Sequence, residues 1–186
     1  MKKIIGYFMF MSLLFSFGCK KTDTRIIIET NFGKIEAELY PEKSPVTVKN
    51  FLRYVDEKFY DGTIFHRVLP GMLIEGGGYT PGMKIKPCHE PILNEATNGL
   101  SNLRGTIAMA RTREIHSSTS QFFINVDDNT FLDHGHHGYG YCVFGKVMDM
   151  DIVDKIKNQP TKIVKDQKFA PITDVVIQSI KRKKIF

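Results

Sequence analysis

Hydrophobic and polar residues alternate along several short stretches of the chain, which predicts a fold made mainly of β-strands. Residues 25–30 contain the β-branched run Ile26-Ile27-Ile28, and residues 34–39 alternate polar and apolar side chains. The turn Asn31-Phe32-Gly33 lies between them, so this region predicts a β-hairpin. Similar apolar stretches bounded by turn residues predict strands at 63–69, around Ile74, and at 105–110, 121–126, 141–147 and 172–181.

Two stretches have the spacing of a helix instead. In residues 46–58 the apolar side chains of Val48, Phe51, Leu52 and Val55 share one face, and Ser44-Pro45 provides an N-cap and a first-turn proline. Residues 149–157 predict a second, shorter helix, whereas residues 79–104 have no periodicity and predict a loop. We therefore expect eight strands and two helices in a closed antiparallel β-barrel, which leaves no exposed edge.

Length and composition fit one globular domain. The chain has 186 residues, of which 42% are hydrophobic and 25% charged, and this balance argues against disorder. The formal net charge is +6, with a basic cluster at Lys181-Arg182-Lys183-Lys184. Because no aromatic residues interleave with this cluster, it favours a solvated strand end over an anionic lipid surface, and nucleic acid is not expected as a partner.

The first 19 residues have the three parts of an export signal. Lys2-Lys3 precedes an apolar run at 4–17 that is too short to span a bilayer comfortably, and Ser16-Phe17-Gly18-Cys19 resembles a bacterial lipoprotein box. We expect a signal peptide at 1–18, lipidated Cys19 with a linker at 19–24, and one domain at 25–186. The protein would then be an exported bacterial lipoprotein, periplasmic or at the outer membrane, and Lys20 favours the outer one. Plain secretion and an uncleaved anchor are the alternatives.

The two remaining cysteines, Cys88 and Cys142, are too few for a disulfide framework. Cys142 lies in the apolar run Tyr141-Cys142-Val143-Phe144 and is interpreted as a small buried hydrophobe.

Five sequence blocks follow one another in an order that resembles the cyclophilins, particularly their bacterial branch. They are Phe65-His66-Arg67-Val68-Leu69-Pro70-Gly71, Gly105-Thr106-Ile107-Ala108-Met109-Ala110-Arg111, Ser120-Gln121-Phe122-Phe123-Ile124-Asn125, Phe131-Leu132 and Tyr141-Cys142-Val143-Phe144-Gly145-Lys146-Val147. The resemblance covers about residues 25–181. It implies a cyclophilin-like barrel and peptidyl-prolyl cis-trans isomerase activity on proline-containing polypeptides, by a monomer without cofactor or metal.

The resemblance also implies roles for individual residues. Arg67 matches the catalytic arginine, Gln121 the glutamine that holds the substrate backbone, and Phe123 the floor of the proline pocket. The other substrate-binding positions are Met72, Leu73, Glu75, Ala110, Arg111, Thr112, Phe131, Leu132 and Tyr141. At five of them the chain departs from the residue that is usual in the family: Met72 and Leu73 stand where Phe and Met are usual, Glu75 replaces Gln, Phe131 stands for a frequent Trp, and Tyr141 replaces a frequent His.

The chemistry expected of Arg67 can be argued without the resemblance. Rotation about an amide bond must overcome about 18–20 kcal/mol, and at the twisted transition state the proline nitrogen gains a lone pair that accepts a hydrogen bond. A guanidinium supplies permanent donors, and one charge-assisted hydrogen bond contributes about 1.5–3 kcal/mol. Desolvation by apolar walls adds to this effect, so the reaction needs no nucleophile.

Two alternatives stay open. A cyclophilin-like barrel could capture proline-containing segments as a holdase with little turnover. The loop His134-Gly135-His136-His137 could also bind a transition metal, aided by His89 or His116, although histidine-rich loops occur without ligands. His66 is interpreted as a structural histidine rather than a base.

Overall fold

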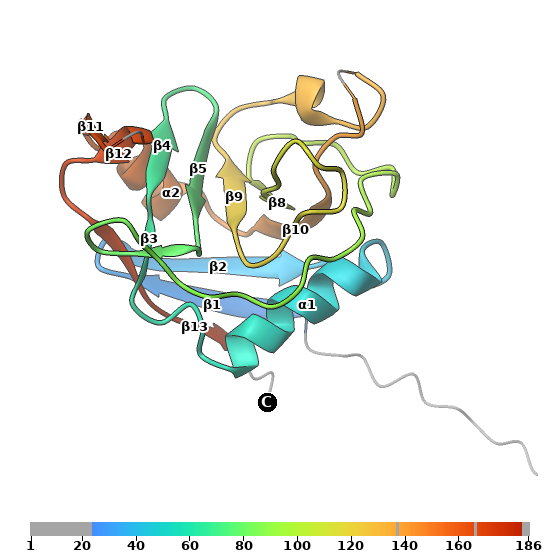
Figure 1. The fold of residues 1–186 in the computed structure, drawn as a ribbon, viewed down its shortest axis with the longest axis horizontal. Helices are drawn as coiled ribbons and strands as arrows, with labels where there is room; N and C mark the ends of the chain where they lie inside the picture. Colours follow the sequence, from blue (N-terminus) through green and yellow to red (C-terminus); the bar gives the residue numbers. More distant parts are fainter. Residues whose placement is uncertain (1–23, 137, 166, 184–186) are drawn as a thin grey trace, which may run out of the picture.

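A computed structural model describes residues 24–136, 138–165 and 167–183, and its main feature is one curled antiparallel sheet (Figure 1). Its eleven strands follow the order β4-β5-β9-β8-β10-β2-β1-β13-β3-β6-β7. Their bounds are β1 Arg25–Thr30, β2 Gly33–Leu39, β3 Thr63–Phe65, β4 Arg67–Leu69, β5 Leu73–Gly76, β6 Tyr79–Thr80, β7 Lys84–Ile85, β8 Thr106–Met109, β9 Phe122–Asn125, β10 Val143–Val147 and β13 Val175–Arg182. A separate hairpin joins β11 (Thr161–Val164) to β12 (Gln167–Pro171) beside β4.

The concave side of the curled sheet encloses the main hydrophobic core. Helix α1 (Pro45–Asp56) and helix α2 (Asp151–Lys157) both contribute side chains to it, for example Phe51 and Ile156. Phe51 contacts Phe122 edge-on with ring centroids 5.5 Å apart and Phe144 in a tilted arrangement at 5.1 Å. Burial of this aromatic cluster fixes how the strands curl around α1.

The strand count and the closure of the sheet differ from the expected closed eight-stranded barrel. The sheet begins at β4 and ends at β7, and within the described ranges no ladder of hydrogen bonds joins these two strands. The Gly77 amide donates to the Ile64 carbonyl over 3.3 Å, which brings the end of β5 next to β3. The expected strand at 63–69 is two strands, because the ladder partner changes at His66 from β13 to β5.

Most other elements agree with the hydrophobic pattern. The hairpin of β1 and β2, both helices, and strands β5, β8, β9, β10 and β13 confirm predictions, with shifts of a few residues at their ends. Three features were missed: the short strands β6 and β7 inside the expected loop at 79–104, and the hairpin of β11 and β12. The loop therefore has structure of its own.

The start of α1 depends on a distant residue. Ser44 is the N-cap residue, as predicted, but its hydroxyl donates to the Val143 carbonyl over 2.9 Å and does not cap the helix. The Glu95 carboxylate accepts hydrogen bonds from the amides of Val46 and Thr47, at 3.1 and 2.8 Å. A carboxylate is favourable there because the first amides of a helix lack backbone acceptors.

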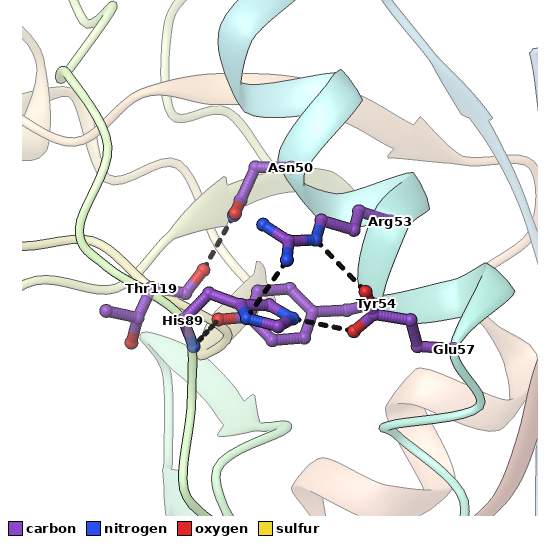
Figure 2. Close-up of polar contacts among 6 residues, drawn as sticks. All are labelled: Asn50, Arg53, Tyr54, Glu57, His89 and Thr119. Carbon is purple, nitrogen blue, oxygen red and sulfur yellow. Dashed lines mark hydrogen bonds and ion pairs between the residues drawn. The ribbon is translucent and has the colours of Figure 1, made fainter.

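The last turns of α1 hold the loop at residue 89 (Figure 2). Arg53 Nε donates to Glu57 Oε1 over 3.0 Å, and an imidazole nitrogen of His89 lies 2.6 Å from Glu57 Oε2. The His89 amide donates to the Tyr54 hydroxyl over 2.8 Å. Earlier in α1, Asn50 donates to the Thr119 carbonyl, so the helix fixes the loops at residues 89 and 119 (Figure 2).

A groove of about 810 Å³ follows the outward side of α1, lined by residues that include Thr24, Pro45, Leu52 and Arg182. In the part of the chain that the structure describes, no helix combines the length and apolar character needed to cross a membrane.

Candidate active site

The candidate site is a row of side chains on the convex side of the sheet. Arg67 on β4 lies opposite Glu75 on β5, and Glu75 lies opposite Phe123 on β9. The row continues to Ala108 on β8 and Val143 on β10. Directly opposite residues in an antiparallel ladder point to the same face. The register therefore places the predicted catalytic arginine and the predicted pocket floor on one surface, with Glu75 between them.

A second, smaller hydrophobic cluster forms on this surface. Its buried members are Leu73, Ala108, Phe123 and Val143, and partly buried side chains pack against them: Leu69, Met72, Leu100, Ala110, Leu132 and Tyr141. Sequence neighbours of these residues, such as Phe122 and Phe144, belong to the main core. The period-two alternation of the strands thus builds two apolar surfaces, one enclosed and one facing outward.

Arg67 and Glu75 form an ion pair. Arg67 Nη1 donates to Glu75 Oε2 over 3.1 Å, while 40% of the Arg67 side chain and 15% of the Glu75 side chain are exposed. Burial raises the pKa of the Glu75 carboxyl, and the neighbouring Arg67 opposes that shift only in part. The guanidinium has five N–H donors, so one hydrogen bond to Glu75 leaves donors for a bound chain.

His66 lies immediately before β4 and is 3% exposed. Burial, and then the charge of Arg67, lowers the pKa of its imidazole to about 4. Its ring stacks at a tilt against Tyr79 with centroids 4.6 Å apart, and its Nδ1 atom has no hydrogen-bond partner in the described residues. A neutral, buried ring agrees with a structural role.

Gln121 lies just before β9, where its carbonyl accepts a hydrogen bond from the Ala110 amide over 3.0 Å. A Cβ atom at Gly78 would overlap the Gln121 side chain, so the glycine allows the backbone to pass directly against it. This close approach explains why a glycine is needed at position 78.

Arg111 fixes one wall of the site rather than pointing into solvent. Its guanidinium lies 4.6 Å from the centre of the Tyr141 ring, and its Nε donates to the Gly140 carbonyl over 2.9 Å. Tyr141 in turn meets Phe123 edge-on, with centroids 5.7 Å apart. The Thr112 hydroxyl and amide both contact the Ser117 hydroxyl, which orders the loop next to this wall.

Phe131 lies apart from the apolar cluster. It belongs to the 3-10 turn Thr130–Leu132 and is 44% exposed, whereas its neighbour Leu132 packs against the cluster. Its role as a pocket wall stays a prediction.

A buried polar network beneath the site was not predicted from the sequence. Asn129 donates to the Met72 carbonyl over 2.7 Å and to Asn125 Oδ1 over 2.8 Å. Asn125 donates to Asn102 Oδ1 over 3.2 Å, and Asn102 donates to Asp133 Oδ1 over 2.8 Å. The network ties β9 to the segments that carry Met72 and Leu132. Its signal in the sequence was weak, since its members are far apart along the chain.

Other predicted features have no clear ligand geometry. Among the described residues no group of three or more His, Cys, Asp or Glu side chains could hold a metal; His137 and the predicted lipidation site Cys19 lie outside those residues. His134 Nδ1 contacts the Tyr139 carbonyl at 2.8 Å. Cys142 is buried, and burial raises the pKa of its thiol, which agrees with a small hydrophobe; Cys88 is exposed and also free.

The fold and the site together are a curled antiparallel sheet that carries an apolar cluster and an arginine side by side on its outer face. The sequence profile of the cyclophilin type peptidyl-prolyl cis-trans isomerase family matches residues 25–182. The chain therefore belongs to the cyclophilin-type peptidyl-prolyl cis-trans isomerase family.

Named relatives agree with this membership. The chain is 53% identical over 161 residues to peptidyl-prolyl cis-trans isomerase A of Dickeya dadantii, which covers 86% of this chain and 85% of that protein. It is 53% identical to peptidyl-prolyl cis-trans isomerase B of Escherichia coli, covering 83% and 97%. A crystal structure of a Cryptosporidium parvum cyclophilin type isomerase, in the presence of the dipeptide Ala-Pro, superposes with a TM-score of 0.75 at 27% identity, covering 87% of this chain and 99% of that one.

Proposed function

We propose that Arg67 is the catalytic residue with which this cyclophilin-type peptidyl-prolyl cis-trans isomerase accelerates rotation about Xaa-Pro bonds. The observation that carries the proposal is the register Arg67–Glu75–Phe123, which sets a guanidinium and an apolar floor on one face. The proline ring would lie over Phe123, walled by Met72 and Leu132. Arg67 would donate to the pyramidal imide nitrogen, which contributes about one to two decades of rate.

The remaining site residues hold the substrate chain on either side of the ring. Gln121 and the backbone from Ala110 to Thr112 would bind its peptide groups, and Glu75 would act through Arg67. Since no bond is broken, the reaction requires positioning, desolvation and one donor, and the proposal includes no metal or cofactor.

A direct test is the exchange rate between the cis and trans forms of an Ala-Pro peptide, measured by NMR with the purified chain. Acceleration at catalytic concentrations supports the proposal, and exchange at the uncatalysed rate would sink it. A second candidate, a holdase for proline-containing segments, is favoured by one observation: Glu75 occupies a donor of Arg67. A holdase would suppress aggregation of an unfolded client while leaving the exchange rate unchanged.

The proposed setting is a bacterial membrane, with the anchored protein in the periplasm or at the outer membrane, where it would assist folding of exported proteins as a monomer. Support comes from the sequence alone: Lys2-Lys3, the apolar run and the lipobox-like Ser16-Phe17-Gly18-Cys19. The finer division into a signal peptide at 1–18, a lipidated linker at 19–24 and a domain at 25–186 belongs to this proposal. Metabolic labelling with a clickable fatty acid tests it, because label must appear on the wild type and disappear in Cys19→Ser.

A further inference from the structure

Glu75 is an unusual neighbour for a catalytic arginine. Its carboxylate lies on β5 between Arg67 and the Phe123 ring, with 15% of the side chain exposed. Within the described residues its one hydrogen bond is the 3.1 Å contact from Arg67 Nη1. A carboxylate in so dry a place costs free energy unless it is paired or takes up a proton.

Among the described residues, one opposite charge faces Glu75 from the neighbouring strands. On β4 the facing group is Arg67, and the adjacent His66 is neutral because burial and Arg67 lower its pKa to about 4. On β9 the facing group is the uncharged Phe123, and Gln121, just before that strand, is also neutral. Burial raises the pKa of Glu75 and Arg67 only partly offsets this, so the carboxyl takes up a proton in milder acid than an exposed one.

The charge state of Glu75 matters for the chemistry because the ion pair is close to the reacting atoms. Arg67 acts through its positive field and its donors on the imide nitrogen. Opposite charges in hydrogen-bond contact still interact appreciably at the effective dielectric of a protein surface, so an ionised Glu75 cancels part of that field. A protonated Glu75 still offers its carbonyl oxygen to Arg67 Nη1 and keeps the same geometry.

We propose that Glu75 is a positioning residue which holds Arg67 and attenuates isomerisation while it is ionised, and that its protonation in mild acid accelerates turnover. This inference rests on the proposed catalytic role of Arg67. It makes the enzyme faster in an acidified compartment, with no change in fold and no effector other than the proton.

The test compares the wild type with Glu75→Gln, which has nearly the same shape and mimics the protonated side chain. Catalysed exchange of an Ala-Pro peptide is measured by NMR, with kcat and KM separated, from about pH 8 to about pH 5. The wild-type kcat should rise by about 3- to 10-fold on acidification, with KM nearly constant. The variant should have a flat profile, with a kcat above that of the wild type at neutral pH and close to it in acid.

The matched control is Glu57→Gln, which makes the same change in the exposed pair on α1 and should keep the wild-type profile. Circular dichroism at each pH confirms that all three proteins stay folded. A Glu75→Gln profile parallel to that of the wild type, or a kcat below it at neutral pH, would overturn the inference while leaving the isomerase proposal intact. Absence of catalysed exchange in all proteins would instead overturn the isomerase proposal and this inference with it.

Discussion

Among the residues that the structure describes, two Arg–Glu pairs have a histidine beside them, and their different exposure to solvent shifts the pKa of the two glutamates in opposite directions. At the end of α1, Arg53, the C-cap residue Glu57 and His89 of a neighbouring loop are joined at the surface (Figure 2), and 43% of the Glu57 side chain is exposed. At the site, Arg67 pairs with Glu75 next to His66, and 15% of the Glu75 side chain is exposed.

The pKa of Glu57 is lowered by His89 and then by Arg53, whereas that of Glu75 is raised by burial despite Arg67. The same residue types therefore make a stable surface clamp of Arg53, Glu57 and His89, and a group that titrates in milder acid at Glu75. The lesson is that desolvation, more than the identity of the partner, decides which charges in this fold respond to mild acid.

The largest expected difference between the two regions is in acid stability, through the histidines. The pKa of the His66 imidazole is about 4 in the folded state and 6.5 in the unfolded state. Between these pH values the unfolded chain binds a proton on His66 and the folded chain does not. Above pH 6.5 proton binding at His66 does not lower the free energy of unfolding. As the pH falls to about 4, proton binding by the unfolded chain lowers that free energy by roughly 3 kcal/mol.

Urea titrations across this pH range measure the effect. His66→Asn should reduce the acid dependence, whereas His89→Asn, at the exposed clamp, should leave it almost unchanged. Equal acid slopes for the wild type and His66→Asn would contradict the assignment.

The next effect is on catalysis and separates the two arginines. Arg67→Ala should lower kcat/KM for an Ala-Pro peptide by about 10- to 100-fold, because the transition state loses a charge-assisted donor. Binding of the peptide should be largely kept, since the apolar cluster around Phe123 is untouched. Arg53→Ala removes a comparable ion pair on α1 and should have wild-type kcat/KM. Similar losses in both variants would mean that the arginines act only through stability.

The smallest effect concerns the clamp itself. Exposed ion pairs contribute little to stability and are screened by salt, so Glu57→Gln should barely move the urea midpoint. The His89 amide would still donate to Tyr54 in this variant and hold the loop. A large drop in the midpoint, or altered isomerisation, would show that the clamp is coupled to the site.

The parts of the fold that were predicted are those with a local signal. Strand β2 and helix α1 follow from periods of two and 3.6 residues, and their bounds agree closely with the pattern. The hairpin of β11 and β12 was missed because exposed Ile163 and Phe169 are mixed with lysines, so no alternation marks a buried face. The break at His66 was invisible because it reflects a change of ladder partner.

The site shows the same division. Arg67, Gln121 and Phe123 were named from the resemblance, but their shared face depends on strand register, which no single segment encodes. The departure at Glu75 was evident in the sequence, whereas its burial, and with it the direction of its pKa, required the structure. The polar network of Asn102, Asn125 and Asn129 joins separate loops and gives no periodic signal.

The carboxylate that begins α1 also sets an order of events during synthesis. Glu95 accepts hydrogen bonds from the amides of Val46 and Thr47, and it lies 49 and 48 residues after them in the sequence. In a nascent chain that contains the helix segment but not yet the later loop, these two amides donate to water, because their Glu95 acceptor has not yet been synthesised. Protection of the amides at positions 46 and 47 from hydrogen exchange would report when the loop with Glu95 docks. The first turn of the helix would then be completed among the later steps of folding.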